Sequence, residues 1–168
     1  MAGRATSPAI ERSPHARFMR RAIALARRGM DARQGGPFGA VVVRDGTIVG
    51  AGWNRVVAAT DPTAHGEIVA IRAACRRLGS FHLAGAVLYT TGEPCPMCLT
   101  AAYWARIDRI FYGFTIRDAA RIGFDDRVFY RELAKPASRR VVPAAQLLGA
   151  EARRLVREFA AMPRRTRY

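Results

Sequence analysis

Residues 90–106 read TTGEPCPMCLTAAYWAR, and this stretch decides the class of the chain. Two cysteines, Cys95 and Cys98, stand three residues apart among prolines, so at helical spacing both thiols lie on one face. A Cys-x-x-Cys pair is compatible with a redox couple, with half of a structural zinc knot, or with part of a catalytic metal site. The rest of the chain has to distinguish these three interpretations.

Helix and strand patterns alternate on both sides of this stretch. Ser13 and Pro14 predict the start of a helix that ends near Gly29, and Asp45-Gly46 between two apolar runs predicts a β-hairpin. We expect the following segments after the hairpin: a helix from about 61 to Gly79, a strand at 86–91, a helix from 93, a strand at 108–114, an irregular stretch at 115–133, a strand at 139–143 and a helix at 150–162 with Leu155, Val156 and Phe159 facing inward. This alternation predicts an α/β fold, a three-layer α/β/α sandwich with a central mixed sheet.

The length and composition indicate one soluble domain. We expect residues 1–14 to form a disordered arm and residues 15–168 to form a single catalytic domain. The arm lacks the apolar core of a secretory signal, and no apolar run approaches the roughly 20 residues that span a membrane. Three cysteines argue against a disulfide framework, so we expect a cytoplasmic location. Because no apolar run is long enough to span a membrane, we also expect no membrane partner.

The net charge of +15 raises the possibility of a nucleic-acid partner. Only one of the 28 basic residues is a lysine, Lys135, and the basic residues are scattered along the chain. A binder of phosphates through charge alone would use both types of basic residue. A solvated basic face is therefore favoured over a nucleic-acid patch, and no nucleic-acid partner is expected.

A histidine upstream completes a metal site with the two cysteines. His65 falls at the start of one helix and Cys95 and Cys98 at the start of the next, with a single strand between them. Consecutive helix starts can meet at one edge of the sheet in such a fold, which would bring one imidazole and two thiolates together. Three such ligands indicate zinc with an open fourth position, as in catalytic sites. A structural knot would need a fourth ligand, and the spare Cys75 lies on an apolar helical stripe.

An acid next to His65 matches the needs of a hydrolytic site. Glu67 lies two residues after His65 and can carry protons beside the metal without binding it. Taken alone, Glu67 would be an ordinary acid complementing the dipole of its helix. The cysteines downstream favour the catalytic role, and a redox couple would need neither His65 nor Glu67.

The combined pattern, His65-Gly66-Glu67 followed by PCPMC at 94–98, is the zinc-deaminase signature. It resembles the cytidine-deaminase-like superfamily. Within that superfamily the stretches GGPFGAVVVRDG, DPTAH, EPCPMCLTAAYWAR and DAARIGFDD resemble the bacterial guanine deaminases, over nearly the whole chain. The resemblance implies hydrolysis of guanine to xanthine and ammonia, one zinc ion per subunit and a small nucleobase substrate. It also implies a homodimer whose subunits exchange their C-terminal segments.

The same resemblance assigns roles to particular residues. His65, Cys95 and Cys98 match the zinc ligands, and Glu67 matches the proton shuttle. The residues that match base-binding positions are Asn54, which would hydrogen-bond the ring, Asp126, which would read the purine, Phe38, which would pack against the base, and Tyr168, which would close the pocket. Without the resemblance, Asp126 would be an ordinary loop acid.

Two glycines depart from the family pattern. Gly66 stands where alanine is usual and is expected to leave the pocket wall slightly more open, and Gly92 stands where cysteine or another small residue is usual. Gly66 keeps other small rings open as substrates, namely guanosine or an amino-triazine. A transfer-RNA adenosine deaminase is a further alternative, although an aromatic C-terminus would obstruct a flipped nucleotide. A non-catalytic zinc module would need a fourth protein ligand.

Overall fold

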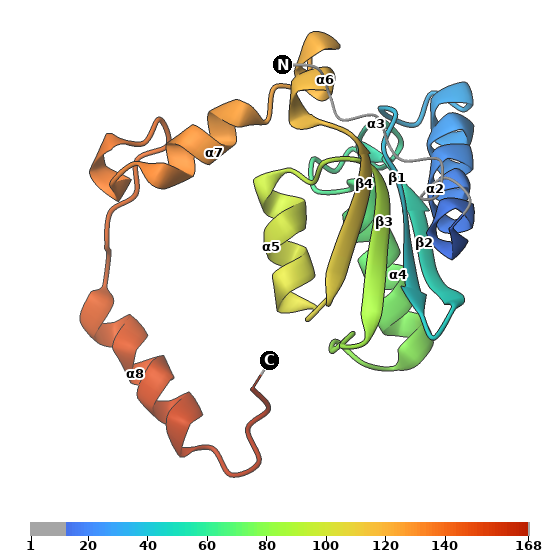
Figure 1. The fold of residues 1–168 in the computed structure, drawn as a ribbon. Coiled ribbons are helices and arrows are strands. Elements are labelled where there is room, and N and C mark those ends of the chain that lie inside the picture. The colour runs from blue at the N-terminus through green and yellow to red at the C-terminus, as the bar shows by residue number, and fades with distance from the viewer. Residues whose placement is uncertain (1–12, 168) are drawn as a thin grey trace. The chain divides into compact units, whose positions relative to one another are not determined.

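The computed structural model describes residues 13–167, and Figure 1 labels their helices and strands. The helices are α2 (Pro14–Asp31), α3 (Val56–Ala59), α4 (Gly66–Leu78), α5 (Pro96–Trp104), α6 (Ile116–Arg121), α7 (Arg127–Ala134), the 3-10 helix η1 (Ala137–Arg139) and α8 (Gly149–Ala161); the strands are β1 (Gly39–Arg44), β2 (Thr47–Trp53), β3 (Ala86–Gly92) and β4 (Arg109–Phe114). The chain divides into two compact units, one that ends at Arg127 and one that begins at Val128.

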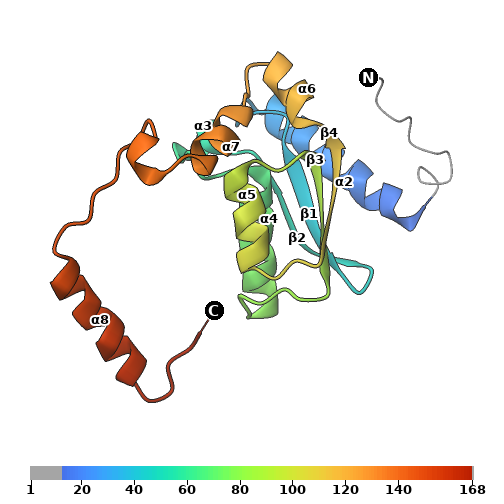
Figure 2. The same cartoon turned by 60° about the vertical axis from the view of Figure 1, so that its left-hand side comes forward.

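The first unit contains a mixed sheet with the strand order β2-β1-β3-β4. Strand β1 pairs antiparallel with β2 and β3, and β3 pairs parallel with β4. Helix α2 covers one face of the sheet, and α4 and α5 cover the other (Figures 1 and 2). The predicted three-layer α/β/α sandwich is confirmed.

The alternating side chains of the inner strands fill the core on both faces of the sheet. Val41 and Tyr89 pack with α2, whereas Val42 and Leu88 pack with α4 and α5. All four side chains are almost completely buried. Burying a side chain such as Leu88 contributes roughly 1.5–3 kcal/mol to folding. The core therefore holds the helix starts of α4 and α5 on a rigid sheet.

The first hairpin and the first helix follow the sequence prediction, apart from one boundary. Asp45 and Gly46 both have positive φ angles, 49° and 72°, as a type I′ turn requires. Ser13 stands at the N-cap position of α2 and Pro14 is its first residue, but the helix continues past Gly29 to Asp31. A Cβ atom at Gly29 would lie 2.4 Å from Cδ1 of Trp53, so this glycine permits close packing and does not end the helix.

The helices that carry the metal ligands begin slightly later than predicted. His65 and Cys95 are the N-cap residues of α4 and α5, with extended ψ angles of 154° and 167°, and they do not belong to the first turns. Gly79 ends α4 in the left-handed conformation, as predicted.

The segment after β4 differs most from the prediction. The stretch predicted to be irregular contains α6 and most of α7, and α6 begins with a capping box between Thr115 and Asp118. The strand predicted at 139–143 is wrong, because this segment is a 3-10 turn and coil in which Val141 and Val142 are each 79% exposed. Helix α8 forms, but its apolar side chains are exposed within the chain and do not face inward.

Two further features describe the chemical character of the chain. Cys75, Cys95 and Cys98 are all free cysteines and form no disulfide. Among the described residues, no helix has the length and the apolar character needed to cross a membrane.

Candidate active site

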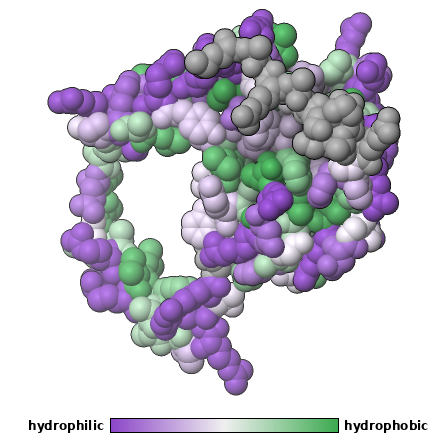
Figure 3. All heavy atoms as spheres, viewed as in Figure 1, coloured by the Kyte–Doolittle hydropathy of each residue, from purple (hydrophilic) through white to green (hydrophobic). Residues whose placement is uncertain are grey.

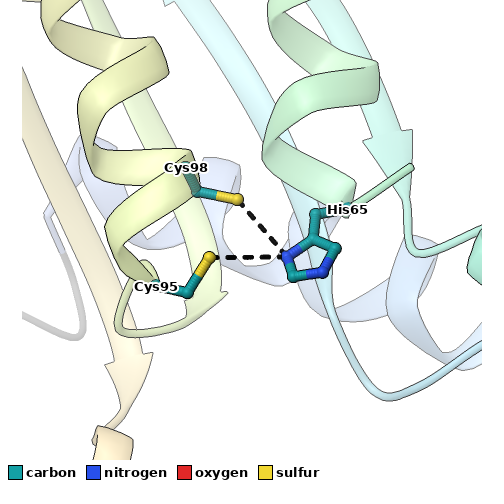
Figure 4. A group of neighbouring side chains, drawn as sticks. All are labelled: His65, Cys95 and Cys98. Carbon is teal, nitrogen blue, oxygen red and sulfur yellow. Dashed lines mark hydrogen bonds between the residues drawn. The ribbon is translucent and has the colours of Figure 1, made fainter. Parts of the chain in front are cut away.

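Three potential metal ligands meet where α4 and α5 begin (Figure 4). Nδ1 of His65 lies 3.6 Å from Sγ of Cys95 and 3.5 Å from Sγ of Cys98. The ligand atoms of the three residues all lie within 4.8 Å of one another. A tetrahedral zinc ion with ordinary Zn–N and Zn–S bonds would separate its nitrogen and sulfur ligands by about 3.5 Å. The donor set and its spacing therefore fit zinc with one open position.

The charges of the two thiols differ before any cation is bound. A hydrogen bond from Cys98, supported by His65, lowers the pKa of Cys95 to about 4, although burial opposes this shift. The same hydrogen bond and burial raise the pKa of Cys98 far above its usual value. The hydrogen bond to Cys95 also raises the pKa of His65. The site is thus a thiolate beside a thiol, and a divalent cation would have to displace the Cys98 proton.

Glu67 lies in the first turn of α4, beside the metal ligands. Its side chain is buried, with a residue exposure of 3%. Burial raises the pKa of this carboxyl above its usual value, because the charged form is poorly solvated there. A carboxyl with a raised pKa is a stronger base than an ordinary glutamate, which suits a group that takes up a proton and returns it.

A cavity of about 210 Å³ opens beside these residues. Its lining includes His65, Glu67 and Cys95, and it also includes Phe38, Asn54 and Asp126, three of the residues predicted to hold the base. Its volume lies below the roughly 300 Å³ at which sites for drug-sized ligands begin, so it suits a small ring. Tyr168, the fourth predicted base-binding residue, lies outside the described residues.

Asn54 is fixed in the wall of the cavity by its own hydrogen bonds. Its backbone N–H donates to the carbonyl of Phe38 at 2.7 Å, and its Oδ1 accepts from the backbone N–H of Val56 at 3.2 Å. Asp126 is partly buried, and burial together with the Cys95 charge raises the pKa of its carboxyl. The lining of the cavity therefore contains one amide, from Asn54, and one partly buried carboxyl, from Asp126.

Several lining residues were not predicted from the sequence, and Phe124 and Glu93 are among them. Phe124 packs edge-on against Phe38, with 5.1 Å between ring centroids, and Phe38 also packs against Phe114. Phe124 belongs to the GFDD motif, from which only Asp126 was predicted, and Glu93 belongs to the EPC motif, from which only Cys95 was predicted. The two motifs could therefore have indicated both residues.

The prediction that Gly66 opens the pocket wall is wrong. A Cβ atom at Gly66 would lie 2.7 Å from the carbonyl oxygen of Phe38, so backbone already occupies that space. The same carbonyl accepts the hydrogen bond of Asn54. Gly66 thus allows the loop that carries Phe38 to lie directly against the start of α4.

The family of the chain follows from comparison with known proteins. Residues 12–114 match the cytidine and deoxycytidylate deaminase zinc-binding region, so the chain belongs to this family of zinc-binding deaminases. Within the family it is 51% identical to the guanine deaminase of Bacillus subtilis over 133 residues, which cover 79% of this chain and 85% of that protein. The tRNA-specific adenosine deaminase of Agrobacterium fabrum is 47% identical over 96 residues, which cover 57% of this chain and 62% of that protein.

A solved structure agrees with this assignment. The X-ray structure of the Bacillus subtilis guanine deaminase superposes with a TM-score of 0.88 and 45% identity, covering 92% of this chain and 98% of that chain. The predicted resemblance to the bacterial guanine deaminases is confirmed by this match and by the sequence identity.

Proposed function

We propose that the chain catalyses the zinc-dependent hydrolytic deamination of guanine to xanthine and ammonia. The observation that carries the proposal is one cavity whose lining contains His65, Cys95 and Glu67 together with Asn54 and Asp126. The similarity to the Bacillus subtilis guanine deaminase extends over most of both chains and supports guanine as the substrate.

A zinc ion held by His65, Cys95 and Cys98 would bind a water molecule and lower its pKa toward neutrality. Glu67 takes a proton from this water, so that the water oxygen can bond to carbon 2 of guanine. Glu67 then delivers that proton to the ring nitrogen beside carbon 2. It next moves the remaining hydroxyl proton to the amino group, and the C–N bond breaks to release ammonia. One buried carboxyl thus acts as base and as acid in turn.

The base would be oriented by other residues of the cavity lining. The amide of Asn54 donates to ring acceptors of guanine, and the carboxylate of Asp126 accepts from its N–H groups. Phe38 packs against the base, and Tyr168 is proposed to close the pocket. A carboxylate cannot donate, so Asp126 disfavours rings that present only acceptors at that edge.

An assay of ammonia release tests this proposal against its alternatives. The substrates are guanine, guanosine, adenine, cytosine, the amino-triazine ammeline and an anticodon stem-loop. Guanine should be the preferred substrate. Preferential turnover of the stem-loop would identify a transfer-RNA adenosine deaminase, and preference for guanosine or ammeline would identify a deaminase of another small ring.

We also propose a homodimer in which the segment from Val128 onward is exchanged between subunits. No described residue of this segment is buried, and Figure 3 shows apolar and hydrophilic residues interleaved along it. Its exposed apolar side chains include Leu147, Leu155, Val156 and Phe159. A segment that buries nothing by itself gains stability only by covering another surface. Light scattering should give twice the chain mass of 18.5 kDa, and a monomer would contradict the proposal.

The remaining predictions about the chain belong to the same proposal. We propose one catalytic domain over residues 15–168, a cytoplasmic location and a role in purine catabolism. Three free cysteines, two of them placed as metal ligands, are typical of a reducing compartment. The basic residues are proposed to form a solvated surface without a nucleic-acid partner. Fractionation of cells, followed by the assay above, tests the location.

A further inference from the structure

Glu93 connects two segments that both contribute to the lining of the cavity. It follows the last residue of β3 and stands two residues before the ligand Cys95. Its backbone N–H donates to the carbonyl of Phe114 at 2.9 Å, and its Oε2 accepts from the backbone N–H of Ile116 at 2.9 Å. Both bonds cross from the end of β3 to the point where β4 gives way to α6.

The segment held by Glu93 leads to a wall of the cavity. Helix α6 ends at Arg121, and the backbone N–H of Phe124 donates a hydrogen bond to the carbonyl of Ala119 at 3.0 Å. Phe124 and Asp126 then line the cavity. The position of α6 therefore decides where this wall stands relative to the metal ligands.

Helix α6 does not need Glu93 in order to form. Thr115 and Asp118 cap it reciprocally, through the bonds Asp118 N–H to Thr115 Oγ1 at 3.3 Å and Thr115 N–H to Asp118 Oδ2 at 3.0 Å. What the carboxylate of Glu93 adds is the attachment of this helix to β3. A hydrogen bond to a charged acceptor is stronger than one between neutral groups, which suits an attachment of this kind.

We infer that Glu93 is a positioning residue, which holds the wall formed by Phe124 and Asp126 at the distance from the metal ligands that a purine requires. It acts through the Ile116 amide and does not touch the reacting atoms. The substrate named here rests on the proposed function. Since Asp126 binds the base in the ground state and in the transition state alike, a displaced wall weakens binding of both equally and raises KM.

Three variants test this role by steady-state kinetics with guanine and by zinc analysis. Glu93→Ala removes the acceptor, whereas Glu93→Gln retains an oxygen that can accept from Ile116. Asp108→Ala is the matched control, because Asp108 Oδ1 accepts from the N–H of Gly85 at 3.0 Å and joins β3 to β4 at their other end. Glu93→Ala should raise KM roughly tenfold, a loss typical of misplaced binding groups, with kcat and zinc content near those of the wild type. Glu93→Gln and Asp108→Ala should both stay near the wild-type KM.

Hydrogen exchange gives a readout that does not need turnover of guanine. In Glu93→Ala the amides of residues 115–126 should exchange faster than in the wild type, and in Asp108→Ala they should not. A wild type that does not deaminate guanine, but shows this exchange pattern, overturns the proposed substrate and leaves the positioning role supported. The positioning role is overturned by unchanged exchange in Glu93→Ala, by a fall in kcat without a rise in KM, by loss of zinc, or by a Gln variant as impaired as the Ala variant.

Discussion

Nδ1 of His65 lies 3.5 Å from Sγ of Cys98, although 33 residues separate them in the chain. Each residue stands at or near the start of a helix on the same face of the sheet, and only β3 intervenes between the two helices. The sheet therefore builds the metal site by aligning two consecutive helix starts, and the site should be as stable as the core beneath it.

Replacing Cys95 by alanine should remove zinc from the protein. Two ligands and a buried glutamate cannot hold the ion as three ligands do, so zinc measured by elemental analysis should fall close to zero, along with ammonia release. Cys75→Ala is the matched control, because Cys75 lies on α4, packs against the hydrophobic core and is outside the ligand group. Full zinc content in the Cys95 variant would refute the assignment of this ligand.

Zinc binding should release protons and weaken as the pH falls. Cys98 carries a proton at neutral pH because its pKa is raised, whereas Cys95, with a pKa of about 4, is already a thiolate. Lower pH favours the protonated ligands and so opposes the metal. Titration calorimetry at pH 7 in buffers of different ionisation enthalpy should report at least one proton released per zinc ion. Binding without proton release would show that Cys98 is not a ligand.

Asp126→Asn should weaken selection of the base without removing zinc. An amide that replaces the carboxylate loses the charged acceptor, and loss of such a hydrogen bond costs about 1.5–3 kcal/mol, or roughly a tenfold to hundredfold rise in KM. Asp125→Asn is the neighbouring control, because Asp125 pairs with Arg127 at 2.6 Å. Equal effects of the two substitutions on KM would remove the case for Asp126 as the base reader.

Gly66→Ala should lower kcat/KM for guanine several-fold. Its Cβ would press on the carbonyl of Phe38, which also accepts from the backbone N–H of Asn54, so both residues that are proposed to hold the base should move. Alanine raises helix propensity by up to about 1 kcal/mol, and the melting temperature should therefore not fall in step with activity. Wild-type kinetics in this variant would show that the loop absorbs the methyl group without cost.

The sequence was most informative where the signal is local. The Asp45-Gly46 turn and the left-handed Gly79 cap demand particular backbone angles, and both occur where predicted. The capping pattern Thr115-x-x-Asp118 was an equally local signal for α6, which the prediction of an irregular stretch overlooked.

Features that depend on tertiary packing could not be predicted in this way. The pattern of Val141 and Val142 is typical of a strand, yet no neighbouring strand pairs with them in the described chain. Helix α8 has an apolar face, and amphipathicity does not specify which surface will cover it. The close approach of Phe38 to Gly66 arises between two segments nearly thirty residues apart, so no spacing rule reveals it.

The most direct test of the central claim is ammonia release from guanine by Glu67→Gln, measured together with its zinc content. Glutamine preserves the shape of the buried side chain but cannot accept and return a proton. We predict that the variant binds zinc as the wild type does and loses nearly all turnover. Turnover close to that of the wild type at full zinc content would contradict the role of Glu67 and, with it, the proposed deamination mechanism.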